Sequence, residues 1–257
     1  MGGLVRLTYW LTQGSGNKIT NHLKVDKRPW PGEIRGHGVG YGVDKKTVSA
    51  WRATTAAGYR WMYSDGPYFL RRKPDSVRLV WDTQWFVSGS QRRVKSLEEK
   101  GCILQDHAPG DVIFVCPSSS MMHGFRDGDT DKAWVDRTIA KLRQHTDRPI
   151  EVRRKGAASG IDIRVAEMQP IFDRAWAIVT EGSTIGCEAI AAGVPVFTDR
   201  ECAASPLAHR DLAEIEEATI KGDRERWAHN LTARQFSSAE LRNGRALRVL
   251  MEDGGFA

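Results

Sequence analysis

The chain has 257 residues, of which 40% are hydrophobic, 27% charged and 9% aromatic. This composition indicates a globular protein with one large core or two smaller ones, and it excludes a chain that is disordered throughout. Lys and Arg outnumber Asp and Glu by 38 to 32, which gives a formal net charge of +6 and a pI near 9.2. A positive surplus favours an anionic partner such as a nucleotide, a nucleic acid or a charged glycan, without choosing among them.

Several other classes of protein are excluded by short-range features. The longest apolar stretches, 112–117 and 189–197, fall far short of the roughly 20 residues that a membrane-spanning helix needs. The first eleven residues hold no sustained apolar segment, so a signal peptide is not expected. The four cysteines are widely spaced and form no CxxC pair, which favours reduced thiols and a cytoplasmic location, the host cytoplasm for a viral protein. No DxD-like cluster or His/Cys spacing argues for a metal ion.

The first half of the chain has only short apolar runs. Its pattern predicts a helix over 47–57, strands over 59–63 and 77–81, and a helix over 90–100. The segment 14–42 is rich in glycine and proline and has few periodic apolar residues, so we expect it to be irregular loop.

From Asp111 onward, strands and helices alternate. The apolar run 112–116 ends at a proline, as a buried parallel strand does. The elements predicted after it are helices over 133–145, 163–172 and 183–193 and strands over 149–153, 175–180 and 194–197. Residues 223–250 are amphipathic, strongly charged and predicted to be helical. The alternation predicts an α/β protein with a parallel sheet and helices on both of its faces.

The segment 177–197 carries the clearest chemical signal. An apolar strand ends at Thr180, a tight turn of Gly182, Ser183 and Thr184 follows, and a helix begins there. Free N–H groups at a helix start bind phosphate, and the two hydroxyls add further donors. Glu188 lies one helical turn beyond Thr184 on the same face, where its carboxylate can accept hydrogen bonds from two ribose hydroxyls. In the alternative interpretation, Ser183 only caps the helix and Glu188 is an exposed helix residue.

Two further groups of residues follow predicted strands at the same sheet edge. Arg153 and Lys155 lie at the carboxyl end of the strand 149–153, and the carboxyl edge of an open α/β sheet is where ligands bind. Both are suited to neutralising the leaving diphosphate of a sugar donor, although a solvated basic turn is the alternative. Ser118 opens a small-residue loop after the strand 112–116, which is either a second donor contact or a plain polar loop.

The stretch 177–197 resembles the donor-binding region of GT-B-type glycosyltransferases, as in capsule-polysaccharide sugar transferases and small glycosyltransferases of tailed bacteriophages that modify DNA. The resemblance covers 111–197 well and 202–245 more loosely. The basic strand end at 147–155 is similar to the same family, and Ser64-Asp-Gly-Pro-Tyr-Phe69, with Arg71 and Arg72 behind it, is similar to a motif of the phage proteins.

The resemblance implies two Rossmann-like domains that face a cleft, with C-terminal helices bracing both. The domains expected from it are an acceptor-binding domain at 1–108, a nucleotide-sugar-binding domain at 109–222 and a helical tail at 223–257. Gly182, Ser183 and Thr184 then hold the diphosphate and Glu188 the ribose. The donor is expected to be a UDP-sugar, and no cofactor or metal is expected to be required.

Sugar transfer to a hydroxyl benefits from a general base that takes its proton. Asp65 is the first candidate because it directly follows a predicted strand, although an Asp-Gly-Pro sequence is more commonly a simple turn. His37 is the second candidate. The glycines around it do not form a dinucleotide-binding motif, because no convincing strand precedes them and no helix obviously follows.

Basic residues interleave with aromatic ones in the first half of the chain, as on nucleic-acid-binding surfaces. The candidate acceptor contacts are Arg35, Tyr68, Arg71 and Arg72. In the alternative interpretation of the pattern, the tryptophans serve a mixture of core and surface roles. Together with this pattern, the resemblance to the phage proteins implies sugar transfer to a flipped-out 5-hydroxymethylpyrimidine in double-stranded phage DNA. One alternative is a transferase acting on capsule or lipid-linked polysaccharide, and another is a non-catalytic nucleotide- or nucleic-acid-binding protein of the same fold. The oligomeric state stays open.

Overall fold

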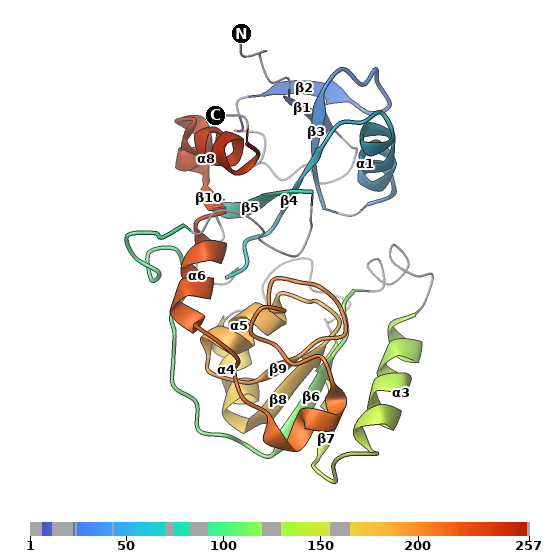
Figure 1. Cartoon of the computed structure of the whole chain (residues 1–257), viewed down its shortest axis with the longest axis vertical. Coiled ribbons are helices and arrows are strands. Elements are labelled where there is room, and N and C mark those ends of the chain that lie inside the picture. The colour runs from blue at the N-terminus through green and yellow to red at the C-terminus, as the bar shows by residue number, and fades with distance from the viewer. Residues whose placement is uncertain are drawn as a thin grey trace. The chain divides into compact units, whose positions relative to one another are not determined.

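The computed structural model (Figure 1) describes residues 7–11, 23, 25–42, 44–69, 75–82, 92–119, 130–154 and 165–255. Contacts within the chain divide it into two compact units. The first comprises Met1–Pro67, Lys73–Arg92 and Ala233–Ala257, and the second comprises Tyr68–Arg72 and Arg93–Thr232. Each unit contains its own β-sheet, so the mixed α/β class predicted from the sequence is confirmed.

The first unit contains a six-stranded sheet in the order β10-β5-β4-β3-β1-β2. Its strands are β1 (Leu7–Leu11), β2 (Asp26–Pro29), β3 (His37–Tyr41), β4 (Trp61–Asp65), β5 (Ser76–Trp81) and β10 (Gln235–Ser237). The strands β1 to β4 pair in parallel, whereas β5 and β10 pair antiparallel. Helix α1 (Lys45–Ala56) connects β3 to β4, and α7 (Ser238–Arg242) and α8 (Arg245–Asp253) follow β10.

Buried aromatic side chains build much of this unit. Trp10 and Trp61 are both buried in it. Glycines make room for Trp61, because a Cβ added to Gly38 or Gly40 would lie 2.6 or 2.5 Å from its indole ring. These two tryptophans therefore contribute to packing, which was the alternative interpretation of the basic and aromatic pattern.

Several predictions for the first half need correction. The segment 14–42 is not all loop, because β2 and β3 lie within it. Strand β2 is exposed at the sheet edge, and two of the five residues of β3 are glycine, so neither has a clear apolar pattern. The helix expected at 90–100 is absent from its described part, 92–100, which is coil and turn. The backbone of this segment bonds to a distant helix instead, since Val94 N donates to His229 Nδ1 of α6 (Arg224–Thr232) at 3.2 Å.

The second unit contains a four-stranded parallel sheet in the order β7-β6-β8-β9, which confirms the parallel sheet predicted from the alternation. Its strands are β6 (Val112–Cys116), β7 (Ile150–Val152), β8 (Ala175–Thr180) and β9 (Val196–Phe197). Its helices are α3 (Asp131–Leu142), α4 (Val165–Arg174), α5 (Ile185–Ala191), the 3₁₀ helix η3 (Leu212–Glu217) and α6 (Arg224–Thr232).

Helices cover both faces of this sheet, as predicted (Figure 1). On one face, Trp134 of α3 packs in a core with Ile113 and Val179. On the other face, α5 packs in ordinary van der Waals contact, since a Cβ on Gly186 would lie 3.4 Å from Thr180 Cγ2 and 3.5 Å from Val196 Cγ1. No helix among the described residues is long and apolar enough to cross a membrane.

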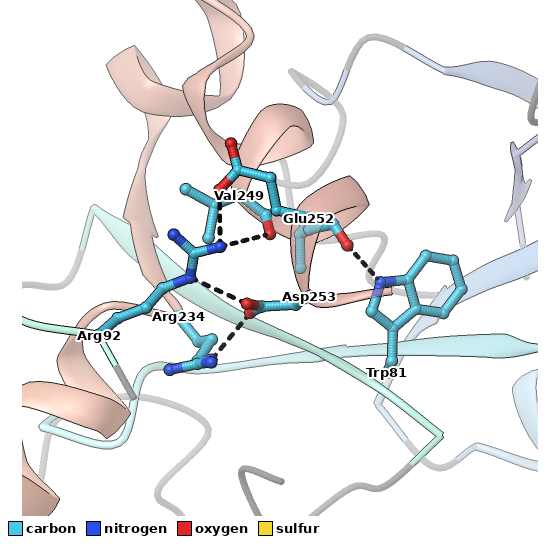
Figure 2. A network of polar contacts seen from close by, with 7 residues as sticks. Trp81, Arg92, Arg234, Val249, Glu252 and Asp253 are labelled. Atoms are coloured by element: carbon cyan, nitrogen blue, oxygen red, sulfur yellow. Dashed lines mark hydrogen bonds and ion pairs between the residues drawn. The ribbon is translucent and has the colours of Figure 1, made fainter. Parts of the chain in front are cut away.

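The C-terminal segment belongs to the first unit, which differs from the predicted helical tail at 223–257 and from the predicted boundary at 108. After α6 the chain forms β10, which pairs antiparallel with β5, with Phe236 opposite Val77. Helix α8 then packs against β5, and Trp81 Nε1 donates a 2.7 Å hydrogen bond to the carbonyl of Leu250 (Figure 2). Strand β10 could not be predicted from the sequence, because it has only three residues and forms through pairing with the distant strand β5.

Candidate functional site

The parallel sheet of the second unit has a topological switch point between β6 and β8. The chain leaves β6 for β7 on one side of it, and returns to β8 on its other side. The loops after β6 and β8 therefore diverge at the carboxyl edge of the sheet. In open α/β sheets, ligands bind in the crevice where two such loops separate. The residues predicted to bind a donor in this unit lie on these loops, after β7 or in α5.

Thr180 joins the two strands at the switch point. It is the last residue of β8, and its hydroxyl donates a 2.8 Å hydrogen bond to the carbonyl of Cys116 at the end of β6. The same hydroxyl oxygen accepts a longer bond, 3.3 Å, from Ser183 N. Gly182 between them has a φ of 148°, which a residue with a side chain rarely adopts. Thr180 thus orients the Gly182–Thr184 turn.

A helix follows this turn, as predicted, but α5 begins at Ile185 rather than at residue 183. Thr184 occupies the N-cap position and makes no side-chain capping bond, while Ser183 Oγ lies 3.5 Å from Ile185 N, the outer limit for a hydrogen bond. Both side chains are half-buried. Glu188 is also half-buried and lies one turn along α5, with its backbone N–H bonded to the carbonyl of Thr184.

Sequence reasoning missed an ion pair at the same edge. Glu181, directly before the turn, is fully buried, and its Oε1 lies 3.0 Å from Nε of Arg200, which follows β9. A buried carboxylate requires a cationic partner, so Glu181 holds Arg200 at this edge, where about a third of the Arg200 side chain remains exposed. The feature of the sequence that could have revealed this ion pair is an acidic residue directly after a buried apolar strand, in Thr180-Glu181-Gly182.

Arg153 reaches the switch point from the β7 side. Its backbone N–H donates to the carbonyl of Val115 at 2.9 Å, which continues the ladder beyond β7. Burial raises the pKa of the neighbouring Cys116 thiol to about 12, and the positive charge of Arg153 partly opposes that rise. Ser118 is half-buried two residues after β6. Arg154 pairs with Asp131 at 3.1 Å, and Lys155 lies outside the described residues.

Asp65, the first candidate base, lies at the carboxyl end of β4 in the first unit. Its carboxylate accepts hydrogen bonds from Tyr63 Oη at 2.8 Å, from the Arg78 guanidinium at 3.0 Å and from Gly66 N at 2.7 Å. Arg78 is buried, so Asp65 also balances a buried positive charge. About a third of the Asp65 side chain is exposed, which leaves it reachable from solvent.

His37, the second candidate base, lies at the opposite edge of that sheet. Its Nδ1 accepts a 3.0 Å hydrogen bond from the backbone N–H of Arg60, and its ring packs edge-on against Trp81. Burial lowers the pKa of His37, the Arg60 charge lowers it further, and Asp82 opposes them. Asp65 is five residues beyond Arg60 along β4, so the two candidates are about 16 Å apart along the strand direction. They do not share one site.

The candidate acceptor residues are scattered. Arg35 is exposed and pairs with Glu33. Tyr68 belongs to the second unit and is 1% exposed, so its ring is not presented to a nucleic-acid base. Arg71 and Arg72 lie outside the described residues. Among the residues that are described, no three His, Cys, Asp or Glu side chains gather as a metal site.

Comparisons with known proteins are informative at the level of structure. No family model matches the chain, and no curated protein sequence matches it. Among solved structures, it is similar to Thermosulfurimonas dismutans KpsC described as a beta Kdo 2,7 transferase. The TM-score is 0.56 at 11% identity, over 93% of this chain and 99% of that chain.

A second similar structure is Thermosulfurimonas dismutans KpsC described as a beta Kdo 2,4 transferase. Its TM-score is 0.51 at 10% identity, over 88% of this chain and 90% of that chain. At such low identity the likeness concerns the backbone fold. The chain therefore shares the fold of these two transferase structures along most of its length.

Proposed function

We propose that this protein is a GT-B-type glycosyltransferase that moves a sugar from a nucleotide-sugar to a polysaccharide acceptor of the capsule type. The observation that carries the proposal is the likeness to the two Kdo transferase structures over about nine-tenths of the chain. The proposal is supported by the position of the described candidates Ser118, Arg153 and Gly182–Thr184, which lie at or after the carboxyl ends of parallel strands, the edge where nucleotides bind in such folds.

A polysaccharide acceptor replaces DNA as the favoured substrate. Both similar structures are described as transferases of the sugar Kdo, and neither description mentions a nucleic acid. The aromatic residues that suggested base stacking include Trp10, Trp61 and Tyr68, which are all buried. The net charge of +6 is equally suited to an acidic glycan.

The proposed roles in the donor site follow from charge and position. Gly182, Ser183 and Thr184 meet the donor phosphate, and Glu188 accepts hydrogen bonds from ribose hydroxyls. Departure of a nucleotide leaves negative charge, and fixed cations stabilise such charge in the transition state. Arg153 and Arg200 are the described cations at this edge that are suited to the task, with Lys155 as a further candidate from the sequence.

The proposed base is Asp65, which takes the proton of the acceptor hydroxyl as the new glycosidic bond forms. In this proposal the two units are the two halves of a GT-B transferase, with the acceptor held by the first. His37 is the alternative base.

The test is an assay of transfer with two classes of acceptor. The protein is incubated with a panel of UDP- and CMP-sugars and either capsule-type oligosaccharides or hydroxymethylpyrimidine DNA, and the products are weighed by mass spectrometry. A mass gain of one sugar on an oligosaccharide is expected. A gain on a nucleoside instead would overturn the choice of acceptor, and neither transfer nor donor hydrolysis would favour a non-catalytic nucleotide-binding protein.

A further inference from the structure

A cavity of about 350 Å³ lies in the second unit, beside α3. One wall is made by α3, including Trp134, Arg137 and Lys141, and the other by the segment that follows β9. Val179 and Thr198 at the ends of β8 and β9 also line it. The described lining of the cavity includes neither the Gly182–Thr184 turn nor the other residues proposed to hold the donor, although Asp199 directly precedes Arg200 in the chain.

The lining of the cavity is cationic on both sides. Arg137 and Lys141 are four residues apart on α3, so they share one helix face, and both are exposed. Arg210 lies in the opposite wall, where its Nη1 donates a 3.4 Å hydrogen bond to the carbonyl of Thr198. Like charges at this helical spacing repel one another.

The two carboxylates of the lining are already bonded within the protein. Asp199 Oδ2 accepts a 3.0 Å hydrogen bond from Trp134 Nε1. Asp211 Oδ1 accepts a 2.9 Å bond from Ala213 N and so caps η3. Hydrogen bonds from neutral donors hold both carboxylates in place without cancelling their charge. Three cations therefore face two carboxylates, and the surplus of one positive charge suits a negatively charged ligand.

The size and remaining chemistry of the cavity indicate a small polar molecule. A volume near 350 Å³ is at the lower end of the range of small-molecule sites, roughly 300–1,000 Å³. Trp134 and Val179 supply apolar surface, and the side chains of Thr138 and Gln144 carry hydrogen-bonding groups. Apolar surface combined with hydroxyl and amide groups matches a sugar ring, which a bare inorganic anion does not need.

We propose that this cavity binds an acidic sugar, one that carries a carboxylate or a phosphate, with Arg137, Lys141 and Arg210 around its charge. The site goes beyond the proposed function, since its ligand is recognised apart from the nucleotide.

Calorimetric titration of the full chain tests the proposal with four probes: glucuronic acid, glucose 6-phosphate, glucose and inorganic phosphate. At least one of the two acidic sugars is expected to bind about tenfold more tightly than glucose and than inorganic phosphate. The tighter of the two identifies the anionic group. Failure of both to bind, or equal binding of neutral glucose, would overturn the proposal.

Variants locate the site. Lys141→Gln and Arg210→Gln are each expected to weaken the acidic sugar about tenfold, because each removes one charged hydrogen-bond donor. Lys132→Gln is the matched control, since Lys132 lies on the same helix, pairs with Asp136 at 2.6 Å and does not line the cavity. Unchanged affinity in both cavity variants would overturn the assignment. Titration with UMP in the same variants separates this site from the donor site, because nucleotide affinity is expected to stay unchanged.

Discussion

Arg234 and Asp253 form an ion pair inside the first unit, with Arg234 Nε 3.0 Å from Asp253 Oδ2 (Figure 2). Their side chains are 1% and 9% exposed. The other carboxylate oxygen of Asp253 accepts a 2.9 Å hydrogen bond from Arg92. Arg92 and Arg234 lie where the chain leaves the first unit and where it returns to it. The Asp253 carboxylate of α8 therefore binds both chain segments at which the first unit continues into the second.

Substitution Asp253→Asn is expected to destabilise the first unit by about 3 kcal/mol, because it removes the carboxylate that pairs with buried Arg234. The measurement is urea unfolding followed by tryptophan fluorescence. Glu252→Gln is the control: Glu252 also bonds Arg92, but its side chain is 51% exposed, so a loss of no more than about 1 kcal/mol is expected. Equal losses in the two variants would contradict the importance given to the buried pair.

Substitution Glu188→Gln is expected to weaken nucleotide binding about tenfold, because a neutral amide is a weaker acceptor for ribose hydroxyls than a carboxylate. Calorimetric titration with UDP and CMP measures the change, and circular dichroism checks that the fold persists. Glu217→Gln, at the exposed end of η3, is the matched control and is expected to bind as the wild type does. An unchanged affinity in Glu188→Gln would remove the proposed ribose contact.

Substitution Asp65→Asn is expected to lower kcat by about 100-fold or more and to leave donor affinity unchanged, because an amide cannot accept the proton. The comparison is kcat against donor Kd. Asp44→Asn is the control, since Asp44 caps α1 through Lys46 N and Thr47 N. Normal turnover with lowered stability in Asp65→Asn would limit Asp65 to balancing the buried charge of Arg78 and would return His37 to consideration as the base.

Acidification is expected to destabilise the first unit through His37. Burial lowers its pKa below the ordinary value of 6.5, so the unfolded chain binds a proton at His37 more readily than the folded chain. The stability that neutral His37 contributes is therefore complete above pH 6.5, and it is lost as the pH falls from 6.5 through the lowered pKa. Protonation of Nδ1 also removes the acceptor for Arg60 N.

Urea unfolding of the wild type and of His37→Asn between pH 7.5 and 5 measures this contribution. Asparagine keeps an acceptor near the position of Nδ1 but does not titrate, so the variant is expected to lose less stability on acidification. Parallel pH profiles for the two proteins would show that His37 is not the group responsible.

Much of the second unit was predictable from the sequence. The strands predicted at 112–116 and 175–180 are observed as β6 and β8 with the same bounds, because each is a continuous apolar run that ends at a turn or proline. The turn Gly182–Thr184 and the helix after it also follow from local pattern. In contrast, β2 has a polar sequence and β10 has three residues, so their strand character comes from pairing with β1 and β5.

The sequence by itself therefore determined the α/β class, the alternation of elements in the second unit and the turn that meets the proposed donor. These features depend on periodicity and on hydrogen bonds between chain neighbours. Only the tertiary structure decided that Glu181 holds Arg200, that Asp65 and His37 lie at opposite edges of one sheet, and that Asp253 joins Arg92 to Arg234. Each of these relationships depends on which distant segments pack together. In the two buried ion pairs, burial then makes each charged side chain need its partner.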